Sequence, residues 1–378
     1  MPNSSTRTHA LESLPASLGA YVHIPFCAHR CDYCSFSVFT DRHHLHHAYI
    51  DALLTEIGEA SERGAMFDTV FVGGGTPSML DPTLLASVVR ALRFAPGTEV
   101  TVECNPDDVT DALVAALLGA GVTRVSLGVQ SSVDHVLVNL GRRHDRAAVG
   151  AAVDVLRRSG LASYNVDLIY GASNESLDDW RTTLDDAVSF GTTHVSAYAL
   201  TVEGGTALAA DPLRQPDDDD QADKYELAHR VLGAAGFANY EVSNWARPGH
   251  ECAHNWRYWR QGEYLGFGCA AHSHVDGARW WNVRTPDRYI ERITSGRDAK
   301  STTERLTPDQ RSMEELQLLL RTRLGVPASS FTPADVSDFV DGGLVDVNGD
   351  RVVLTVRGRL MANALSHRLV NSSAPRRR

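Results

Sequence analysis

Short runs rich in β-branched residues alternate with stretches of helical pattern from Ala20 to about residue 200. Several of the helical stretches open with Asp, Ser or Thr at the position expected of an N-cap. Such an alternation is typical of parallel strands joined by right-handed crossover helices. The sequence therefore predicts an α/β fold. Six strands are predicted, over residues 21–24, 69–73, 99–103, 124–128, 163–169 and 194–199.

Composition narrows the class of protein further. The chain has 378 residues, of which 43% are hydrophobic and 22% charged, so it can bury an extensive core. The 47 acidic residues outnumber the 36 basic ones, and a formal net charge of −11 disfavours general nucleic-acid binding. No window approaches the roughly 18 apolar residues that span a bilayer, and no secretory signal opens the chain. We expect a cytoplasmic protein.

Changes of pattern along the chain predict five parts. They are a short N-terminal segment (1–19), the βα region (20–241), an aromatic-rich extension (242–305), a small C-terminal α+β domain (306–370) and a disordered tail (371–378). The acidic run 217–220 predicts an exposed loop. The C-terminal domain has two predicted helices followed by a hairpin with Asn348-Gly349 at its turn, which resembles a winged helix. Its basic residues are not concentrated on one helix, so packing or partner docking is favoured over DNA binding.

Three cysteines, Cys27, Cys31 and Cys34, fall within eight positions directly after the first predicted strand. Thiolates presented together on one loop suit an iron–sulfur cluster or zinc. A structural zinc site needs a fourth ligand, for which His29 or His23 is available, but closed zinc sites usually come as two spaced pairs. Three ligands to a four-iron cluster leave one iron open to an external chelator. The spacing favours the iron–sulfur interpretation.

The Cys-x₃-Cys-x₂-Cys spacing after Tyr21-Val22-His23-Ile24-Pro25-Phe26 resembles the radical S-adenosylmethionine (SAM) superfamily. That resemblance implies a [4Fe-4S] cluster on the three cysteines and SAM as chelator of the open iron. Reductive cleavage of SAM then supplies a 5′-deoxyadenosyl radical. The resemblance also implies a partial (β/α)₆ barrel, which agrees with the six units counted from the pattern alone.

Polar residues follow the later strands in the order of this family's SAM contacts. Gly73-Gly74-Gly75-Thr76-Pro77 ends the second strand, and consecutive glycines let a backbone approach a ligand, although alone they equally form a tight turn. Arg142 offers a fork for a carboxylate, and Asp167 an acceptor for ribose hydroxyls. Taken singly, each is better interpreted as a satisfied polar residue at a strand end. The resemblance implies SAM contacts by Tyr21, Tyr33, Gly74, Gly75, Thr76, Glu103, Gln130, Arg142, Asp167 and Thr201.

Within the superfamily the chain is most similar to the oxygen-independent coproporphyrinogen III oxidase-like proteins. The similarity includes Gly128-Val129-Gln130-Ser131 and Asp167-Leu168-Ile169-Tyr170-Gly171. True oxidases carry a cysteine two residues after the third ligand, where this chain has Phe36, and they have a longer N-terminal extension than the about twenty residues found here. The segment His254-Asn255-Trp256-Arg257-Tyr258-Trp259 is instead similar to the His-Asn-x-x-Tyr-Trp signature of the haem-chaperone branch.

The resemblance to this branch implies that His254 ligates haem. An imidazole can bind haem iron, and the flanking aromatic rings offer the macrocycle a flat apolar surface. From local chemistry alone His254 is equally a packed core histidine. The implied partners are haem and apo-haemoproteins such as respiratory enzymes, with transient association at the membrane side left open. Two alternatives remain, an oxidase that decarboxylates coproporphyrinogen III and a scaffold stabilised by its cluster. Phe36 opposes the first, and the complete set of SAM contacts opposes the second.

Overall fold

The computed structural model describes residues 17–370, which form two compact units. The first unit contains residues 17–30, 36–125 and 262–305, and the second contains residues 31–35, 126–261 and 306–370. Most of the predicted N-terminal segment and the predicted tail 371–378 lie outside the described residues. The five-part division made from the sequence stays a prediction.

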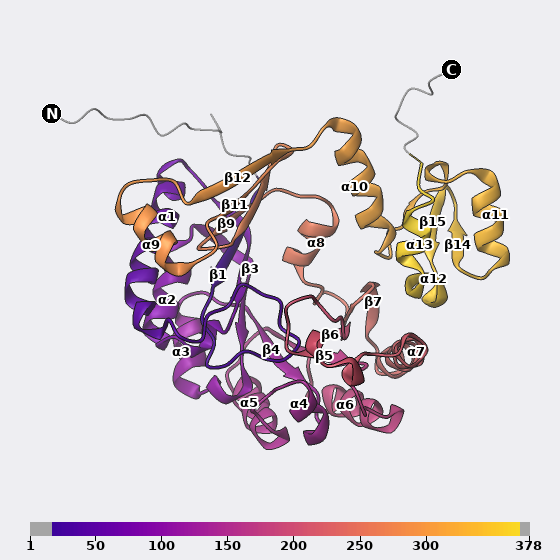
Figure 1. Cartoon of the computed structure of the whole chain (residues 1–378), viewed down its shortest axis with the longest axis horizontal. Helices are drawn as coiled ribbons and strands as arrows, with labels where there is room; N and C mark the ends of the chain where they lie inside the picture. The colour runs from indigo at the N-terminus through magenta and orange to yellow at the C-terminus, as the bar shows by residue number, and fades with distance from the viewer. Residues whose placement is uncertain (1–16, 371–378) are drawn as a thin grey trace. The chain divides into compact units, whose positions relative to one another are not determined.

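Three neighbouring strands of the first unit, β1, β2 and β3, pair in parallel. A further strand pairs with the outer side of β1 in parallel, with Tyr264 opposite Gly19, and antiparallel strands continue the sheet beyond it. The strand order is β12-β11-β10-β9-β1-β2-β3. Figure 1 labels β12, β11, β9, β1 and β3 of this sheet. The bounds are β1 (Gly19–Ile24), β2 (Phe67–Gly74), β3 (Phe94–Cys104), β9 (Tyr264–Phe267), β10 (His272–Val275), β11 (Ala278–Asn282) and β12 (Lys300–Arg305).

Helices α2 (Pro82–Ala91) and α3 (Asp111–Gly119) of the first unit begin where side chains cap their free backbone N–H groups. Asp81 accepts hydrogen bonds from the N–H groups of Thr83 and Leu84, and Thr110 accepts one from Leu113. Each cap satisfies donors that lack a partner within the helix. Strand β1 is buried at five of its six residues, β2 at five of its eight, and β3 only in its second half. Burial on both faces is typical of parallel strands covered by helices. The helices are α1 (His46–Glu62), α2 (Pro82–Ala91), α3 (Asp111–Gly119) and α9 (Pro286–Thr294).

The second unit carries the remaining predicted strands. Strand β4 (Arg124–Gln130) starts in the first unit and ends in the second. Strands β5 (Ser163–Tyr170) and β6 (His194–Ala199) pair in parallel, and the hairpin of β7 (Ala238–Glu241) and β8 (Asn244–Ala246) continues the sheet antiparallel to β6. Its helices are α4 (Asp134–Asn139), α5 (Arg146–Arg158), α6 (Leu177–Ser189), α7 (Asp218–Ala234) and α8 (Ala253–Trp259). All six predicted strands are present, and the α/β class is confirmed.

The acidic run 217–220 is not the loop that the sequence suggested. Asp217 caps helix α7, its carboxylate accepting a hydrogen bond from the N–H of Asp220, and the next three aspartates form the first turn. Negative charge is favourable there because the helix dipole and the unpaired N–H groups are positive at this end. The loop prediction was wrong, because a charge run had been interpreted without its position relative to a helix start.

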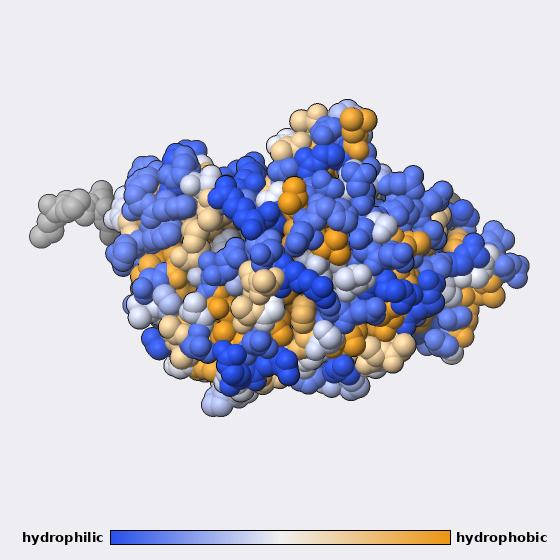
Figure 2. Space-filling view, turned by 90° about the horizontal axis from the view of Figure 1, so that it is seen from below, coloured by the Kyte–Doolittle hydropathy of each residue, from blue (hydrophilic) through white to orange (hydrophobic). Residues whose placement is uncertain are grey.

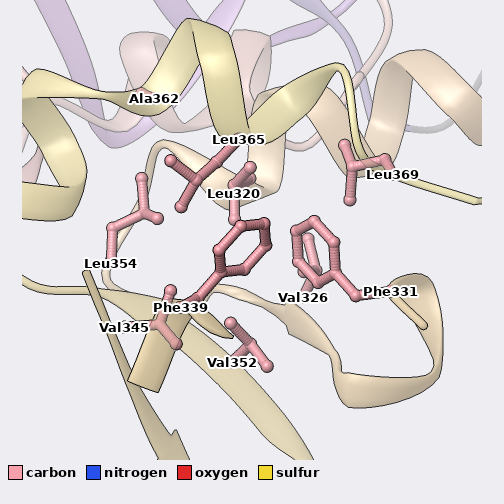
Figure 3. Close-up of a cluster of buried hydrophobic side chains, with 10 residues drawn as sticks. All are labelled: Leu320, Val326, Phe331, Phe339, Val345, Val352, Leu354, Ala362, Leu365 and Leu369. Atoms are coloured by element: carbon pink, nitrogen blue, oxygen red, sulfur yellow. The ribbon is translucent and has the colours of Figure 1, made fainter. Parts of the chain in front are cut away.

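The C-terminal residues of the second unit surround their own apolar core. The three-stranded sheet has the order β13-β15-β14, and a helix precedes it in the chain. The rings of Phe331 and Phe339 meet edge to face at 5.4 Å, with Leu320 and Leu365 on one side and Val352 on the other (Figure 3). The likeness to a winged helix stays a prediction. The elements are α10 (Pro308–Leu320), β13 (Val326–Pro327), α11 (Pro333–Asp341), β14 (Val345–Asn348), β15 (Arg351–Leu354), α12 (Val356–Leu360) and α13 (Ala362–Ser366).

The surface is mixed in character. On the face shown in Figure 2, hydrophobic residues lie interspersed among hydrophilic ones. Among the helices formed by residues 17–370, none has the length and apolar character needed to cross a membrane.

Candidate functional site

Cys27 lies just after β1, at the carboxyl end of a parallel strand. Its N–H donates a hydrogen bond to the carbonyl oxygen of Phe39 over 3.1 Å. The hydroxyl of Thr76 donates to the Cys27 Sγ over 3.4 Å, and His43 Nε2 lies 3.0 Å from the Cys27 carbonyl oxygen. A predicted SAM contact, Thr76, therefore touches the sulfur of a predicted cluster ligand.

The glycines after β2 are packed so closely that a side chain would not fit. A Cβ added to Gly75 would lie 3.0 Å from the Cys27 Sγ, and one added to Gly74 would lie 2.5 Å from His23 Nδ1. Gly74 also has a φ of +115°, and its N–H donates to Glu103 Oε2 over 3.0 Å. We call residues 73–75 the glycine cradle. Their backbone packs directly against a thiol and a carboxylate, and an added side chain would overlap neighbouring atoms.

Tyr21 and His23 form a neutral hydrogen-bonded pair on β1. The Tyr21 hydroxyl lies 3.0 Å from His23 Nδ1, and His23 Nε2 lies 3.0 Å from the carbonyl oxygen of Ser37. Because a carbonyl only accepts, Nε2 carries the proton and Nδ1 accepts from the tyrosine. Burial lowers the pKa of His23 and raises that of Tyr21. With both ring nitrogens engaged, His23 is not placed as the fourth ligand of the zinc alternative.

In the second unit, Arg142 reaches the loop that carries Cys31 and Cys34. Its Nη1 donates to the Cys31 Sγ over 3.5 Å, while Nη2 donates to the carbonyl oxygen of Gly128 over 3.1 Å and lies 3.2 Å from His144 Nδ1. The Cys34 N–H donates to the Cys31 carbonyl oxygen over 3.1 Å. The guanidinium predicted to bind a carboxylate therefore also places a positive charge against a predicted cluster ligand.

Asp167 on β5 is held by two donors from within the unit. Its Oδ2 accepts from the Ser126 hydroxyl over 2.7 Å, and its Oδ1 accepts from Asn165 Nδ2 over 2.8 Å. The Asp167 side chain is partly exposed, whereas Ser126 and Asn165 are buried. The carboxylate is thus oriented from its buried side and keeps an accessible side.

Three further predicted SAM contacts lie at the end of a strand, just after a strand, or between two of the cysteines. Gln130 ends β4 in the left-handed backbone region, with a φ of +66°, and is buried. Thr201 is exposed just after β6, and its hydroxyl lies within 3.4 Å of the Ala199 carbonyl oxygen. Tyr33 is half-buried against an apolar cluster that includes Val136, and burial raises its pKa.

His254 lies inside the molecule on helix α8, with only 1% of its surface exposed. Its Nε2 lies 2.9 Å from the Tyr258 hydroxyl, and the two rings meet edge to face at 4.8 Å. Trp256, which lies between these two residues in the sequence, donates from Nε1 to Glu251 Oε2 over 2.6 Å. The Arg260 guanidinium stacks on the Trp256 ring at 4.8 Å. Ligation of an iron by Nε2 would require exchange of the Tyr258 contact.

Some residues of the site were missed in the sequence, although period-two spacing marks them. Asn165 lies two positions before Asp167 on β5, so the two share a face of their strand. His23 lies two positions after Tyr21 on β1 in the same way, but the sequence suggested it only as a zinc ligand. Ser126 was missed because its contact depends on pairing between strands. Over residues 17–370, no three His, Cys, Asp or Glu side chains are gathered as a preformed metal site, so cluster ligation remains a prediction from spacing.

Comparison with known proteins gives a consistent picture. Residues 21–187 match the model of the radical SAM superfamily. The chain is 41% identical to the heme chaperone HemW of Mycobacterium tuberculosis, with 93% of this chain and 94% of that protein covered. Identity to the HemW of Escherichia coli is 37%, with 79% of each chain covered, and to that of Bacillus subtilis 32%, with 91% and 97% covered.

Among solved structures, the coproporphyrinogen III oxidase HemN of Escherichia coli superimposes with a TM-score of 0.80 over 93% of this chain and 89% of its own. At 23% identity this match shows the fold alone. It confirms the predicted radical SAM fold, whose six predicted strands were expected to form a partial barrel.

Proposed function

We propose, from the premise that the chain belongs to the HemW family of radical SAM proteins, that it binds haem and transfers it to apo-haemoproteins. The observation that carries this proposal is the near full-length similarity to proteins named heme chaperones, 41% over 93% of the chain. A domain shared only in part would not support transfer of a whole function, but the match covers 93% of this chain and 94% of that relative.

The resident cofactor that fits the cysteine loop is a [4Fe-4S] cluster on Cys27, Cys31 and Cys34. Soft thiolates in this number suit iron–sulfur ligation and leave one iron without a protein ligand. The contacts already formed are those that a cluster favours, because donors point at the sulfurs from Thr76 and from Arg142. Hydrogen bonds to ligand sulfurs stabilise their negative charge and raise the reduction potential of a cluster.

SAM suits polar groups that each of the two units presents. Its ammonium suits the carboxylate of Glu103, its carboxylate suits the Arg142 fork, and its ribose hydroxyls suit the accessible side of Asp167. The glycines let the backbone of their loop pack directly against Cys27 and Glu103, the latter being the proposed partner of the ammonium. When bound, SAM supplies the remaining ligands of the open iron and the source of a radical. The further contacts that we propose for SAM are Tyr21, Tyr33, Gly74, Gly75, Thr76, Gln130 and Thr201.

Haem is the cargo, and His254 is its proposed axial ligand. Because His254 is buried and bonded to Tyr258, haem uptake requires helix α8 to open or the imidazole to turn outward. The six-residue segment from His254 to Trp259 carries three further aromatic rings that can cover a macrocycle once it does so. We propose that the acceptors are apo-haemoproteins such as respiratory enzymes, met in the cytoplasm or at the membrane side.

Haem titration of matched histidine variants tests this assignment. His254→Ala should lower haem affinity and shift the Soret band, because an axial nitrogen is lost. His250→Ala, four residues earlier and outside the aromatic segment, is the control and should bind haem as the wild type does. Iron and sulfide content of both variants should stay at the wild-type level. Equal haem affinity and equal spectra for His254→Ala and the wild type would remove the ligand role.

A further inference from the structure

We infer that His194 is a positioning residue that fixes, through Asn165, the orientation in which Asp167 meets the SAM ribose. The inference rests on the proposed function, which assigns the accessible side of Asp167 to the ribose hydroxyls. His194 touches neither SAM nor the cluster in this account. It acts through a buried chain of hydrogen bonds that runs across strands of the second unit.

The carboxylate of Asp167 fixes the orientation of the Asn165 amide. Asn165 Nδ2 lies 2.8 Å from Asp167 Oδ1 and 2.6 Å from the Ser126 Oγ. Since a carboxylate only accepts, the nitrogen end of the amide must face Asp167, and the oxygen end must face away. The Ser126 hydroxyl, which accepts from the amide, in turn donates to Asp167 Oδ2 over 2.7 Å. Both oxygens of Asp167 therefore depend on the Asn165 orientation.

The amide oxygen is held in turn by His194. Asn165 Oδ1 lies 2.6 Å from His194 Nδ1 and 3.2 Å from the Ser196 hydroxyl. Because the oxygen only accepts, Nδ1 of His194 carries the proton. A flipped amide would bring its NH₂ group against that N–H and would leave Asp167 facing an oxygen. His194 thereby excludes the wrong orientation as well as stabilising the right one.

Tyr240 holds the other ring nitrogen of His194 in the tautomer that Asn165 requires. With the proton on Nδ1, Nε2 is an acceptor, and the Tyr240 hydroxyl lies 2.9 Å from it. Tyr240 and His194 are fully buried, and Asn165 is 1% exposed, so water does not substitute for a missing partner. The donors thus point one way along the chain, from Tyr240 through His194 and Asn165 to Asp167.

Strand pairing explains why these residues meet. In the parallel pairing of β5 and β6, His194 is opposite Asn165 and Ser196 is opposite Asp167. Side chains two positions apart share one face of a strand, and directly paired residues on neighbouring strands lie side by side on that face. The chain is thus built by the register of the sheet, which a sequence pattern does not reveal.

The inference is tested by SAM affinity of the cluster-loaded protein, with a ligand that isolates the ribose contact. We expect His194→Leu to weaken SAM binding about tenfold, the size of one well-oriented hydrogen bond to a charged group. A SAM analogue whose ribose lacks both hydroxyls should bind the wild type and His194→Leu equally. His194→Asn should restore most of the affinity for SAM, because its amide nitrogen occupies the place of Nδ1. Equal losses for SAM and for the analogue would mean a merely structural role and would overturn the inference, as would unchanged SAM affinity.

Two further variants keep the result interpretable. If His194→Leu fails to fold or to hold iron, Tyr240→Phe removes a single oxygen atom and leaves His194 Nε2 without its donor, so that the imidazole is held at one nitrogen only. It should weaken binding of SAM but not of the analogue, and no loss for SAM overturns the inference. Asp167→Asn reports on the proposed function itself. Wild-type SAM affinity in that variant would refute the ribose contact and the inference together, whereas a loss in Asp167→Asn without one in folded His194→Leu refutes the inference alone.

Discussion

Replacement of Gly74 by alanine is predicted to destabilise the protein at the candidate site itself. The residue has a φ of +115°, which side-chain-bearing residues rarely adopt, and an added Cβ would lie 2.5 Å from His23 Nδ1. The imidazole cannot easily retreat, because its two nitrogens are bonded to Tyr21 and to the Ser37 carbonyl. The change therefore combines backbone strain with overpacking against a fixed ring.

The two contributions can be sized separately. A residue held in such a backbone region costs about 1–3 kcal/mol. Ordinary van der Waals contact is 3.4–4 Å, so a Cβ at 2.5 Å forces a neighbour to move, and overpacking of this kind costs about 1–3 kcal/mol. We expect Gly74→Ala to lower the free energy of unfolding by roughly 4 kcal/mol in all. It should also weaken SAM binding, since the Gly74 N–H orients Glu103.

Urea unfolding followed by circular dichroism measures the effect, and two other glycines serve as matched controls. Gly97 has a φ of +86° with no atom within 4 Å of an added Cβ, so Gly97→Ala should show backbone strain alone. Gly58 lies in helix α1 with open space around it, and Gly58→Ala should be neutral or slightly stabilising. If Gly74→Ala costs no more than Gly97→Ala, the packing argument at the cradle is refuted.

Three other predictions concern the cluster, SAM and pH. Cys34→Ala should not retain four irons per chain after anaerobic reconstitution, because each thiolate holds a different iron, and a full iron content would contradict the ligand assignment. Saturating SAM should change the electron paramagnetic resonance spectrum of the reduced cluster, and an identical spectrum would remove SAM as a ligand of the open iron. Burial raises the pKa of Glu56 to about 7 despite hydrogen bonds from Gly268, Tyr289 and Asn282. The folded state therefore keeps a proton that the unfolded state loses near 4.5, so the free energy of unfolding should fall by up to roughly 3 kcal/mol as pH rises from about 4.5 to 7. Glu56→Gln should reduce this fall in the free energy of unfolding by the contribution of one carboxyl group. An unchanged pH profile would contradict the raised pKa of Glu56.

The strands and most helices of the βα region could be predicted because their signals are local. Runs of β-branched residues and caps such as Asp81 and Thr110 act within a few positions of the chain. The parallel pairing of β9 with β1 could not be predicted in this way, because it joins Tyr264 to Gly19 across most of the sequence. The short helix α4 was also missed, since six residues give too little periodicity to detect.

The same distinction between local signals and contacts of distant residues applies to the candidate site. The cysteine spacing and the glycine run are contiguous and pointed to their chemistry directly, although the roles of the site residues remain proposals. The contacts of Arg142 with the Cys31 sulfur and of His194 with Asn165 depend on register between distant elements. The contact of His254 with Tyr258 was within reach, because residues four apart on a helix lie on one face. What was missing there was the location of the helix and the burial of that face.

Haem transfer and porphyrin oxidation, measured on one reconstituted preparation, separate the chaperone from the oxidase. Phe36, which stands at the position of the oxidases' cysteine, is 63% exposed and offers an apolar ring where those enzymes carry a thiol. With reduced cluster, SAM and coproporphyrinogen III, the protein should form no protoporphyrinogen IX. The same preparation loaded with haem should pass it to an apo-haemoprotein, seen as growth of the acceptor's Soret spectrum. Catalytic formation of protoporphyrinogen IX without haem transfer would contradict the account.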